Sequence, residues 1–198
     1  MPRLIVFTFV AFLCLTPISV KGMEREEFQV VAPNDGHQDE FRLKTNLLLW
    51  AATITNIGVE GAFGEKWSTT LDIWYSPWKI SEKLAVKTIA ILPEIRFWVK
   101  SNRKGSFFNL HANVAWFNVR ANNYRYQDSG RPLLGGGVGY GYRLRLNDRW
   151  GLEFEIGAGV ANAKYDRYYN ITNGAKIDQR STTYWGIDRA SVTITCNL

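Results

Sequence analysis

The sequence predicts an all-β protein, an eight-stranded antiparallel up-and-down transmembrane β-barrel. Two observations lead to this prediction: apolar and polar residues alternate from residue 41 onward, and short connections between the alternating runs take turns with long ones. Successive side chains of a strand point to opposite faces, so the alternation gathers the apolar residues on one face. In a membrane barrel that face contacts lipid, and the polar face lines a narrow interior.

The chain of 198 residues divides into three parts. Residues 1–22 are predicted to be a signal peptide, because Arg3 precedes an apolar run that ends at Leu15 and is too short for a membrane helix. Residues 23–40 are acidic and show no periodicity, which predicts a flexible N-terminal segment. Residues 41–198 are predicted to form the barrel.

Eight alternating runs are the predicted strands. In the seventh run, Glu153 and Glu155 lie on one face, between apolar residues that belong to the other. The connections after the second, fourth and sixth runs are short, and those after the third, fifth and seventh are long, as in outer-membrane barrels. The runs span residues 42–52, 57–63, 67–76, 88–99, 106–119, 137–146, 149–160 and 185–198.

A soluble β-barrel would also bury an apolar face, by turning it inward around an apolar ligand. Aromatic residues near the ends of the runs favour the membrane version, because such residues form belts at the membrane interface. These residues include Trp67, Tyr75, Trp116 and Trp150. The soluble barrel remains open as an alternative at this point.

The polar face carries a charge network that we expect to line the lumen. It contains five acids, five bases and one histidine, and matched charges suggest a self-neutralising structural network because unpaired charges in a confined interior are costly. An ion path, a proton path or a gated pore is the functional alternative. The network consists of Lys44, Glu60, Asp72, Glu94, Arg96, His111, Arg143, Arg145, Glu153, Glu155 and Arg189.

No catalytic, cofactor or metal site is predicted. His111 could act as a base on Ser191, with Glu94 or Glu153 behind it, in a lipid-modifying enzyme. Such chemistry has to face lipid, whereas His111 falls on the interior face. The chain has only two cysteines and two histidines, and the glycine-rich run at 134–142 lacks the spacing of a nucleotide-binding loop.

The three long connections are basic and rich in tyrosine. We expect them to contact the phosphate groups of lipopolysaccharide, or an extracellular or surface protein partner. Nucleic acid is not an expected partner despite the net charge of +6, because the basic residues are scattered. The candidate surface residues are Lys79, Lys83, Arg120, Tyr124, Arg125, Tyr126, Arg131, Lys164, Arg167, Tyr168 and Tyr169.

Four motifs in combination resemble the Bacteroidota family called domain of unknown function 3575, over about residues 41–198. They are Lys-Thr-Asn-Leu-Leu at 44–48, Pro-Trp at 77–78, Pro-Glu-x-Arg-x-Trp at 93–98 and Arg-Trp-x-x-Glu-x-x-x-Gly at 149–157. The resemblance implies a small barrel of OmpX-like size in the outer membrane of a Gram-negative bacterium, inserted by the outer-membrane assembly machinery. It implies no activity.

We therefore expect a non-catalytic outer-membrane barrel with a structural or surface-interaction role, such as adhesion, through its three long connections. Two alternatives belong to other functional classes. One is a lipid-modifying outer-membrane enzyme, and the other is a soluble β-barrel carrier of an apolar ligand.

Overall fold

The computed structural model describes residues 41–101, 103–171 and 174–198, which form nine strands and one short helix. The predicted signal peptide and the acidic segment lie outside the described residues. No described helix is long and apolar enough to cross a membrane. The elements are β1 (Phe41–Asn46), α2 (Leu47–Ala51), β2 (Thr55–Ala62), β3 (Trp67–Lys79), β4 (Leu84–Trp98), β5 (Gly105–Ala121), β6 (Tyr124–Asp128), β7 (Leu133–Arg145), β8 (Trp150–Tyr169) and β9 (Lys176–Asn197).

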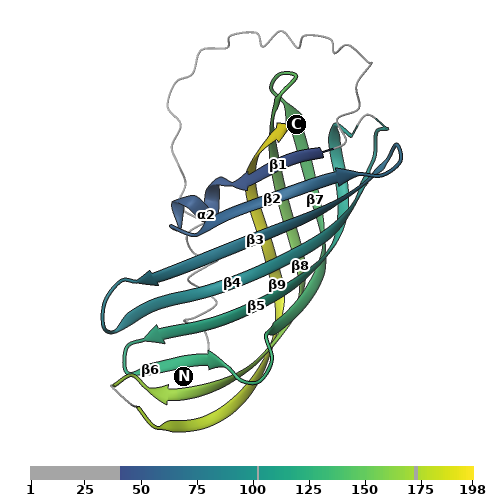
Figure 1. The fold of residues 1–198 in the computed structure, drawn as a ribbon. Coiled ribbons are helices and arrows are strands. Elements are labelled where there is room, and N and C mark those ends of the chain that lie inside the picture. The colour runs from purple at the N-terminus through teal and green to yellow at the C-terminus, as the bar shows by residue number, and fades with distance from the viewer. Residues whose placement is uncertain (1–40, 102, 172–173) are drawn as a thin grey trace, which may run out of the picture. The chain divides into compact units, whose positions relative to one another are not determined.

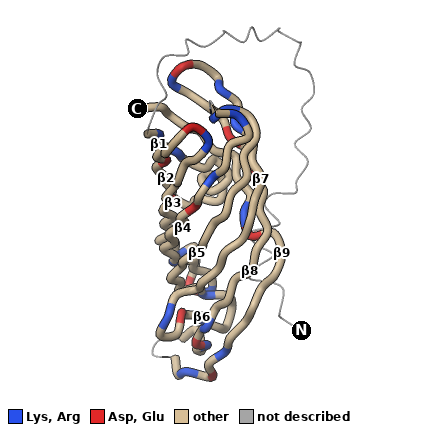
Figure 2. The backbone as a smooth tube through the Cα atoms, turned by 90° about the vertical axis from the view of Figure 1, so that its right-hand side faces the viewer, with Lys and Arg blue, Asp and Glu red and all other residues tan. Residues whose placement is uncertain are grey.

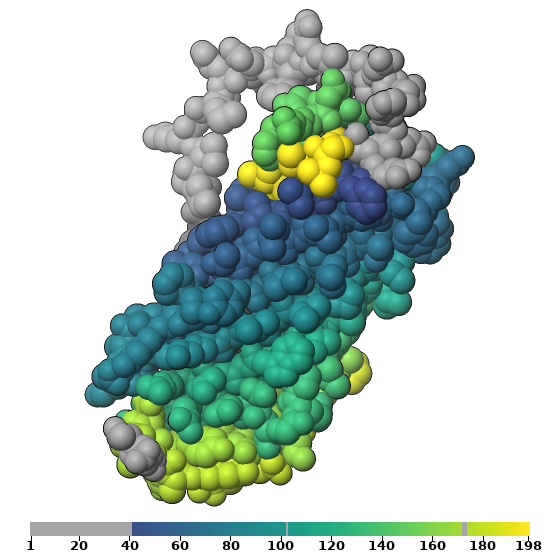
Figure 3. All heavy atoms as spheres, in the orientation of Figure 1, coloured from purple at the N-terminus to yellow at the C-terminus, as the bar shows by residue number. Residues whose placement is uncertain are grey.

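The strands form one antiparallel sheet that closes into a ring (Figure 1). Strands β1 to β5 each pair with the next along the chain, β6 and β7 each pair with both β5 and β8, and β8 pairs with β9, which returns to pair with β1. In the space-filling view, the side chains of β3, β4 and β5 form a continuous surface on one side of the ring (Figure 3). The sequence prediction of an all-β antiparallel fold is confirmed.

The described residues form nine strands rather than the predicted eight, because one position in the ring is occupied by two strands. Both β6 and β7 lie between β5 and β8 and run antiparallel to β5, so they continue each other in the same direction. Residues 129–132 interrupt them. This segment contains Gly130, whose φ of 69° lies in the left-handed region, and Pro132, which cannot donate a ladder hydrogen bond.

The first predicted strand, 42–52, is wrong in its second half, where the structure has helix α2. Asn46 ends β1 and caps the helix, because its side chain accepts a hydrogen bond of 3.0 Å from the backbone N–H of Leu48. The side chain of Asn56 on β2 stabilises this corner between β1 and α2. It accepts a hydrogen bond from the backbone N–H of Asn46 at 2.6 Å and donates one to the backbone carbonyl of Asn46 at 3.0 Å. Three consecutive leucines after Asn46 also end the alternation.

Most of the predicted long connections are strand. The hairpin of β8 and β9 pairs as far as Tyr168 and Lys176, well beyond the end of the predicted strand at 160. The outward positions past Val160 are polar, beginning with Asn162 and Lys164, so apolar alternation stops although the backbone ladder continues. Threonine and tyrosine are frequent in this extension and favour strands without an apolar face.

The ring has two ends that differ in construction. The turn end contains the connections at 63–66, 99–104 and 146–149, and the loop end contains α2, β6 and the connections at 80–83 and 170–175. Strands β3, β4, β5, β8 and β9 extend further at the loop end than β1 and β2 do.

The distribution of side chains is inverted relative to a water-soluble protein. Outward-facing Val138 and Leu110 are each 63% exposed, whereas inward-facing Arg96 and Glu60 are fully buried. Charged residues of an ordinary soluble domain are almost never fully buried, and large exposed apolar faces mark an interaction with another apolar phase. The core of this ring is therefore polar, and its outer face is apolar.

Candidate functional site

Arg96 stands at the centre of the interior and contacts four carboxylates. Its guanidinium lies 3.6 Å from Glu60, 2.9 Å from Glu153 and 3.3 Å from Glu155, and it also pairs with Glu94. These residues come from β2, β4 and β8, and all are buried because the alternation of each strand turns them inward. The arrangement can exist only if the charges compensate one another.

Four further cations complete this group, which we call the interior cluster. Arg143 pairs with Glu60 and Glu153, and Arg189 pairs with Glu94 and lies 3.4 Å from Glu155. Lys44 and Arg42 lie 3.5 Å from Glu153 and Glu60. The cluster consists of Arg42, Lys44, Glu60, Glu94, Arg96, Arg143, Glu153, Glu155 and Arg189.

Two aromatic rings fill the interior beside this cluster. Arg143 lies over the ring of Trp98 at 4.4 Å and Arg96 over the ring of Phe107 at 4.3 Å, which are cation–π contacts. The indole N–H of Trp98 donates to the hydroxyl of Ser68 at 2.9 Å. Both aromatic side chains are fully buried, so side chains occupy this part of the interior.

The structure places eight residues of the predicted network in the cluster, and the other three elsewhere. Asp72 lines a cleft described below, and His111 bonds to a different acid. Arg145 follows the inward-facing alternation of β7 but lies at the turn end, where it forms a solvent-exposed ion pair with Asp148 at 2.9 Å. Arg42 is not among the predicted residues, although it lies on the same face of the strand as Lys44.

Asp188 is also absent from the predicted network, and a β-bulge turns it inward. Gly157 opposes Arg189 and Ala158 opposes Ile187, so Asp188 has no opposite residue on β8. A bulge shifts the alternation by one, and two consecutive residues then face the interior. The pattern of apolar and polar residues in the sequence does not predict this shift.

His111 forms hydrogen bonds through both ring nitrogens. Nε2 lies 2.9 Å from Asp188 Oδ2, and Nδ1 lies 3.0 Å from Asn109 Oδ1. Asn109 in turn donates to Glu155 at 2.8 Å, and Asn113 donates to Asp188 at 3.2 Å. The partners of His111 are therefore Asp188 and Asn109, not the Glu94 or Glu153 of the catalytic alternative.

Glycines let β7 and β8 approach closely beside this histidine. A Cβ on Gly137 would lie 2.4 Å from the carbonyl oxygen of Ala158 and 2.7 Å from the Cα of Gly159. Such contacts are with backbone atoms, which cannot move aside as a flexible side chain could. The wall at this point therefore requires glycine.

We expect Gly137→Ala to lower the free energy of unfolding by about 1–3 kcal/mol through overpacking. Gly61→Ala is the matched control, because a Cβ on this strand glycine would meet only the ring of Phe41, at 3.5 Å. Urea titration of the two variants measures the difference. Equal midpoints would contradict the close approach of β7 and β8.

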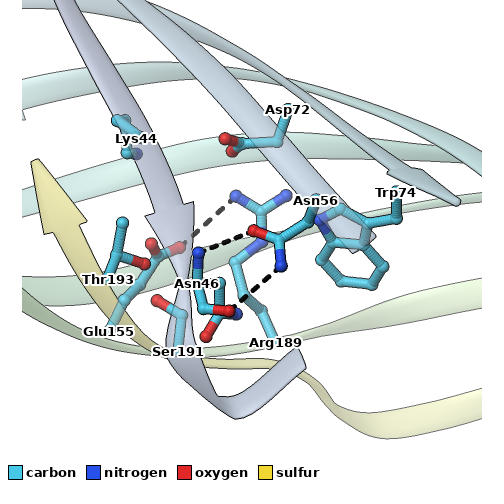
Figure 4. Close-up of a pocket in the computed structure, with 9 residues that line it drawn as sticks. All are labelled: Lys44, Asn46, Asn56, Asp72, Trp74, Glu155, Arg189, Ser191 and Thr193. Atoms are coloured by element: carbon cyan, nitrogen blue, oxygen red, sulfur yellow. Dashed lines mark hydrogen bonds and ion pairs between the residues drawn. The ribbon is translucent and has the colours of Figure 1, made fainter. Parts of the chain in front are cut away.

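A small polar cleft opens at the loop end of the interior (Figure 4). It has about 350 Å³ of empty space, part of which is open to solvent. Side chains from β1, β2, β3, β8 and β9 meet there. The lining residues are Lys44, Asn46, Asn56, Asp72, Trp74, Glu155, Arg189, Ser191 and Thr193.

The candidate surface residues gather in the extended sheet at the loop end. Arg125 lies over the ring of Tyr168 at 4.5 Å, and Arg167 lies over the ring of Tyr124 at 5.1 Å. Arg167 also donates two hydrogen bonds, of 3.1 and 2.9 Å, to Asp178. Charged residues occur at this end of the tube as well as at the opposite end (Figure 2).

The same extension positions the other candidates. Most lie on strands rather than in loops, and arginine and tyrosine alternate between neighbouring strands. Lys79 and Lys83 lie at the β3–β4 connection, Arg120 on β5, Tyr124, Arg125 and Tyr126 on β6, Arg131 between β6 and β7, and Lys164, Arg167, Tyr168 and Tyr169 on β8.

Asp166 in this extension has a lowered pKa. The chief cause is its contact with Lys176, whose Nζ lies 2.7 Å from Asp166 Oδ2, and the amide of Gln179 adds a bond of 3.2 Å. Because the folded pKa lies below the unfolded value of about 3.9, the contact stabilises the hairpin above that pH. The stabilisation is lost as the pH falls through the folded pKa.

We expect Lys176→Met to raise the pKa of the Asp166 carboxyl, and the carboxyl ¹³C shift of Asp166 followed against pH measures it. Lys100→Met is the control, because Lys100 is exposed at the turn end. A titration midpoint that stays unchanged in Lys176→Met would show that the ion pair does not form in solution.

The described residues contain no group of three or more side chains that could hold a metal ion. A family model described as "Protein of unknown function (DUF3575)" matches residues 11–198. The match spans every element of the ring. No curated protein and no solved structure matches the chain.

Proposed function

The chain belongs to the DUF3575 family of proteins of unknown function, and we propose that its ring is a non-catalytic transmembrane β-barrel. The observation that carries the proposal is the inversion of the ring, with apolar side chains outside and buried ion pairs inside. In lipid the outer face has an apolar solvent, and closure of the ring leaves no strand edge along most of its circumference. The proposed location is the outer membrane of a Gram-negative bacterium.

Aromatic residues on the outer face support this orientation. Trp67 and Trp150 lie near the turn end, whereas Trp116 and Trp185 lie near the loop end, where the outward apolar residues give way to polar ones. Two such belts are typical of the interfaces on either side of a membrane. Short turns then face the periplasm, and the extended strands face outward.

The filled interior favours a structural or binding role over conduction. The interior cluster and the rings of Trp98 and Phe107 occupy the space that a pore would need. An eight-position ring is only wide enough to be filled by its own side chains. The protein thus contributes a stable wall in the membrane that presents a surface at its loop end.

Membrane fractionation and electrophoresis test the barrel. We would express the chain in a Gram-negative host, wash the membranes with carbonate, and compare heated with unheated samples in SDS. The barrel predicts a washed-membrane protein whose mobility changes on heating. A protein that is found in the soluble fraction and shows no mobility change would refute the membrane barrel and favour the soluble-carrier alternative.

The surface role rests on the basic and aromatic extension at the loop end, which we propose contacts the phosphates of lipopolysaccharide. A basic side chain near an anionic membrane surface contributes about 1 kcal/mol. We expect Lys83→Glu with Arg120→Glu to weaken binding of the purified protein to lipopolysaccharide vesicles by about tenfold or more at low salt. Lys100→Glu at the turn end is the control. Equal binding of the vesicles by the original protein, the double variant and Lys100→Glu would refute the proposed contact with lipopolysaccharide.

A further inference from the structure

The wall of the ring is interrupted at the loop end beside β1. Strand β1 stops at Asn46 and pairs with β9 only through Thr193–Asn197. From Val192 back to Lys176, β9 has no strand partner on that side among the described residues; α2 lies against β9 there, and the N–H of Val192 donates to the side chain of Asn46 at 3.4 Å. Helix α2 occupies the place where β1 would continue.

The polar cleft lies at this interruption. Asn46, Ser191 and Thr193 line it from β1 and β9, and Asn56, Asp72 and Trp74 line it from β2 and β3 (Figure 4). The cleft therefore lies between the interior cluster and Asn46, the residue that caps α2. The outer surface of the gap is apolar, with exposed Leu47 and Trp50 on α2 and exposed Ile187 on β9.

Arg189 lines this cleft, and one edge of its guanidinium is buried without a hydrogen-bond partner. Its Nη1 contacts Glu94 and Glu155, but Nε and Nη2 have no hydrogen-bond partner although Arg189 is only 6% exposed. These two nitrogens form the edge that binds a planar carboxylate through two parallel hydrogen bonds. The hydroxyl of Ser191, on the same lining, has no partner either.

We propose that the cleft binds the carboxylate head of a fatty acid. Arg189 donates two hydrogen bonds to the carboxylate and Ser191 donates a third, while the acyl chain leaves through the gap beside α2 into the surrounding lipid. The exit of the chain rests on the membrane location proposed above. A singly charged planar head fits better than a phosphate dianion, because Asp72 and Glu155 share the lining.

The opposing charge of Asp72 gives the proposal a sharp test. Removing that charge strengthens binding of an anion and weakens binding of a cation, whereas removing the charge of Arg189 does the reverse. The two variants Asp72→Asn and Arg189→Gln should therefore move the affinity in opposite directions. Arg145→Gln is the matched control, because this arginine lies at the turn end.

The probe is octanoate labelled with ¹³C at its carboxyl carbon, titrated into the purified protein in a non-ionic detergent and followed by NMR. We expect saturable binding with one site, about tenfold weaker in Arg189→Gln, about threefold weaker in Ser191→Ala and tighter in Asp72→Asn. Arg145→Gln should bind as the original protein does. Ser191→Ala and Asp72→Asn keep the test valid if Arg189→Gln fails to fold.

Three related molecules separate the parts of the proposal. Octanol should bind at least tenfold more weakly than octanoate because it lacks the charged head, and acetate should bind more weakly because it lacks the chain. Octyl phosphate binding more tightly than octanoate would overturn the head-group class. Octanoate binding that ignores both Arg189→Gln and Asp72→Asn would overturn the site.

The failure of this proposal is distinguishable from failure of the barrel. The mobility change on heating is measured on the same samples and does not depend on octanoate. A heat-modifiable membrane protein that does not bind octanoate keeps the barrel and refutes the fatty-acid site. A soluble protein that binds octanoate through Arg189 keeps the head-group site and refutes the exit into lipid.

Discussion

Replacing Val138 by arginine lowers the free energy of unfolding by about 2–4 kcal/mol if the outer face lies in lipid. Val138 is in the middle of β7 and points outward beside Leu110 and Ala158. A guanidinium at this depth would leave water for hydrocarbon, which is the origin of the cost. On a protein surrounded by water the same exposed position would accept arginine with an effect near ±0.5 kcal/mol.

Leu146→Arg is the control for depth. Leu146 is also an exposed outward residue, but it lies in the β7–β8 turn, where an arginine reaches the interface at a cost of about 0–1 kcal/mol. Urea unfolding of both variants from lipid vesicles gives the comparison. Equal and small effects of the two substitutions would be incompatible with the proposed immersion of the outer face.

Arg96→Met destabilises the ring by about 3–5 kcal/mol, because it removes the partner that four buried carboxylates share. Methionine fills a similar volume, so the loss reports charge compensation rather than a cavity. Arg145→Met is the control, since its pair with Asp148 is exposed and such pairs contribute about 0–1 kcal/mol.

The same cluster offers a rescue of Arg96→Met. Adding Glu155→Gln removes a carboxylate whose one remaining cation, Arg189, lies 3.4 Å away, so the double variant should regain part of the lost stability. Urea midpoints of the single and double variants give the coupling. An Arg96→Met protein as stable as the original would mean that the interior carboxylates do not need Arg96.

Alternation predicts most of the side chains that share the interior. Residues as distant as Glu60, Arg96 and Glu153 were assigned to one face by parity alone, and the structure brings them into contact. The alternation along a strand is enough for this assignment, because inward-facing side chains of a narrow closed sheet lie close to one another. The alternation does not show how far a residue lies from the ends of the ring. For this reason Arg145 is predicted to lie in the interior, although it lies in solvent.

The remaining features depend on interactions that break the alternation. The bulge at Asp188 changes the parity of β9 without a signal in the residue pattern, and the break at 129–132 splits one ring position into two strands. The corner at Asn46 depends on hydrogen bonds to the side chain of Asn56 on the next strand, which the residue pattern does not reveal. The cleft arises from this corner, so the sequence alone did not predict it.

Nitroxide labelling of single cysteines tests the inversion of the ring most directly. In a background in which Cys14 and Cys196 are serine, we would label positions 57, 138 and 156 on the outer face and position 83 at the loop end. In lipid vesicles we expect oxygen to relax the three outer labels while a water-soluble nickel complex does not. We expect the reverse for position 83. Free access of the nickel complex to positions 57, 138 and 156 would refute the proposed immersion of the outer face in lipid.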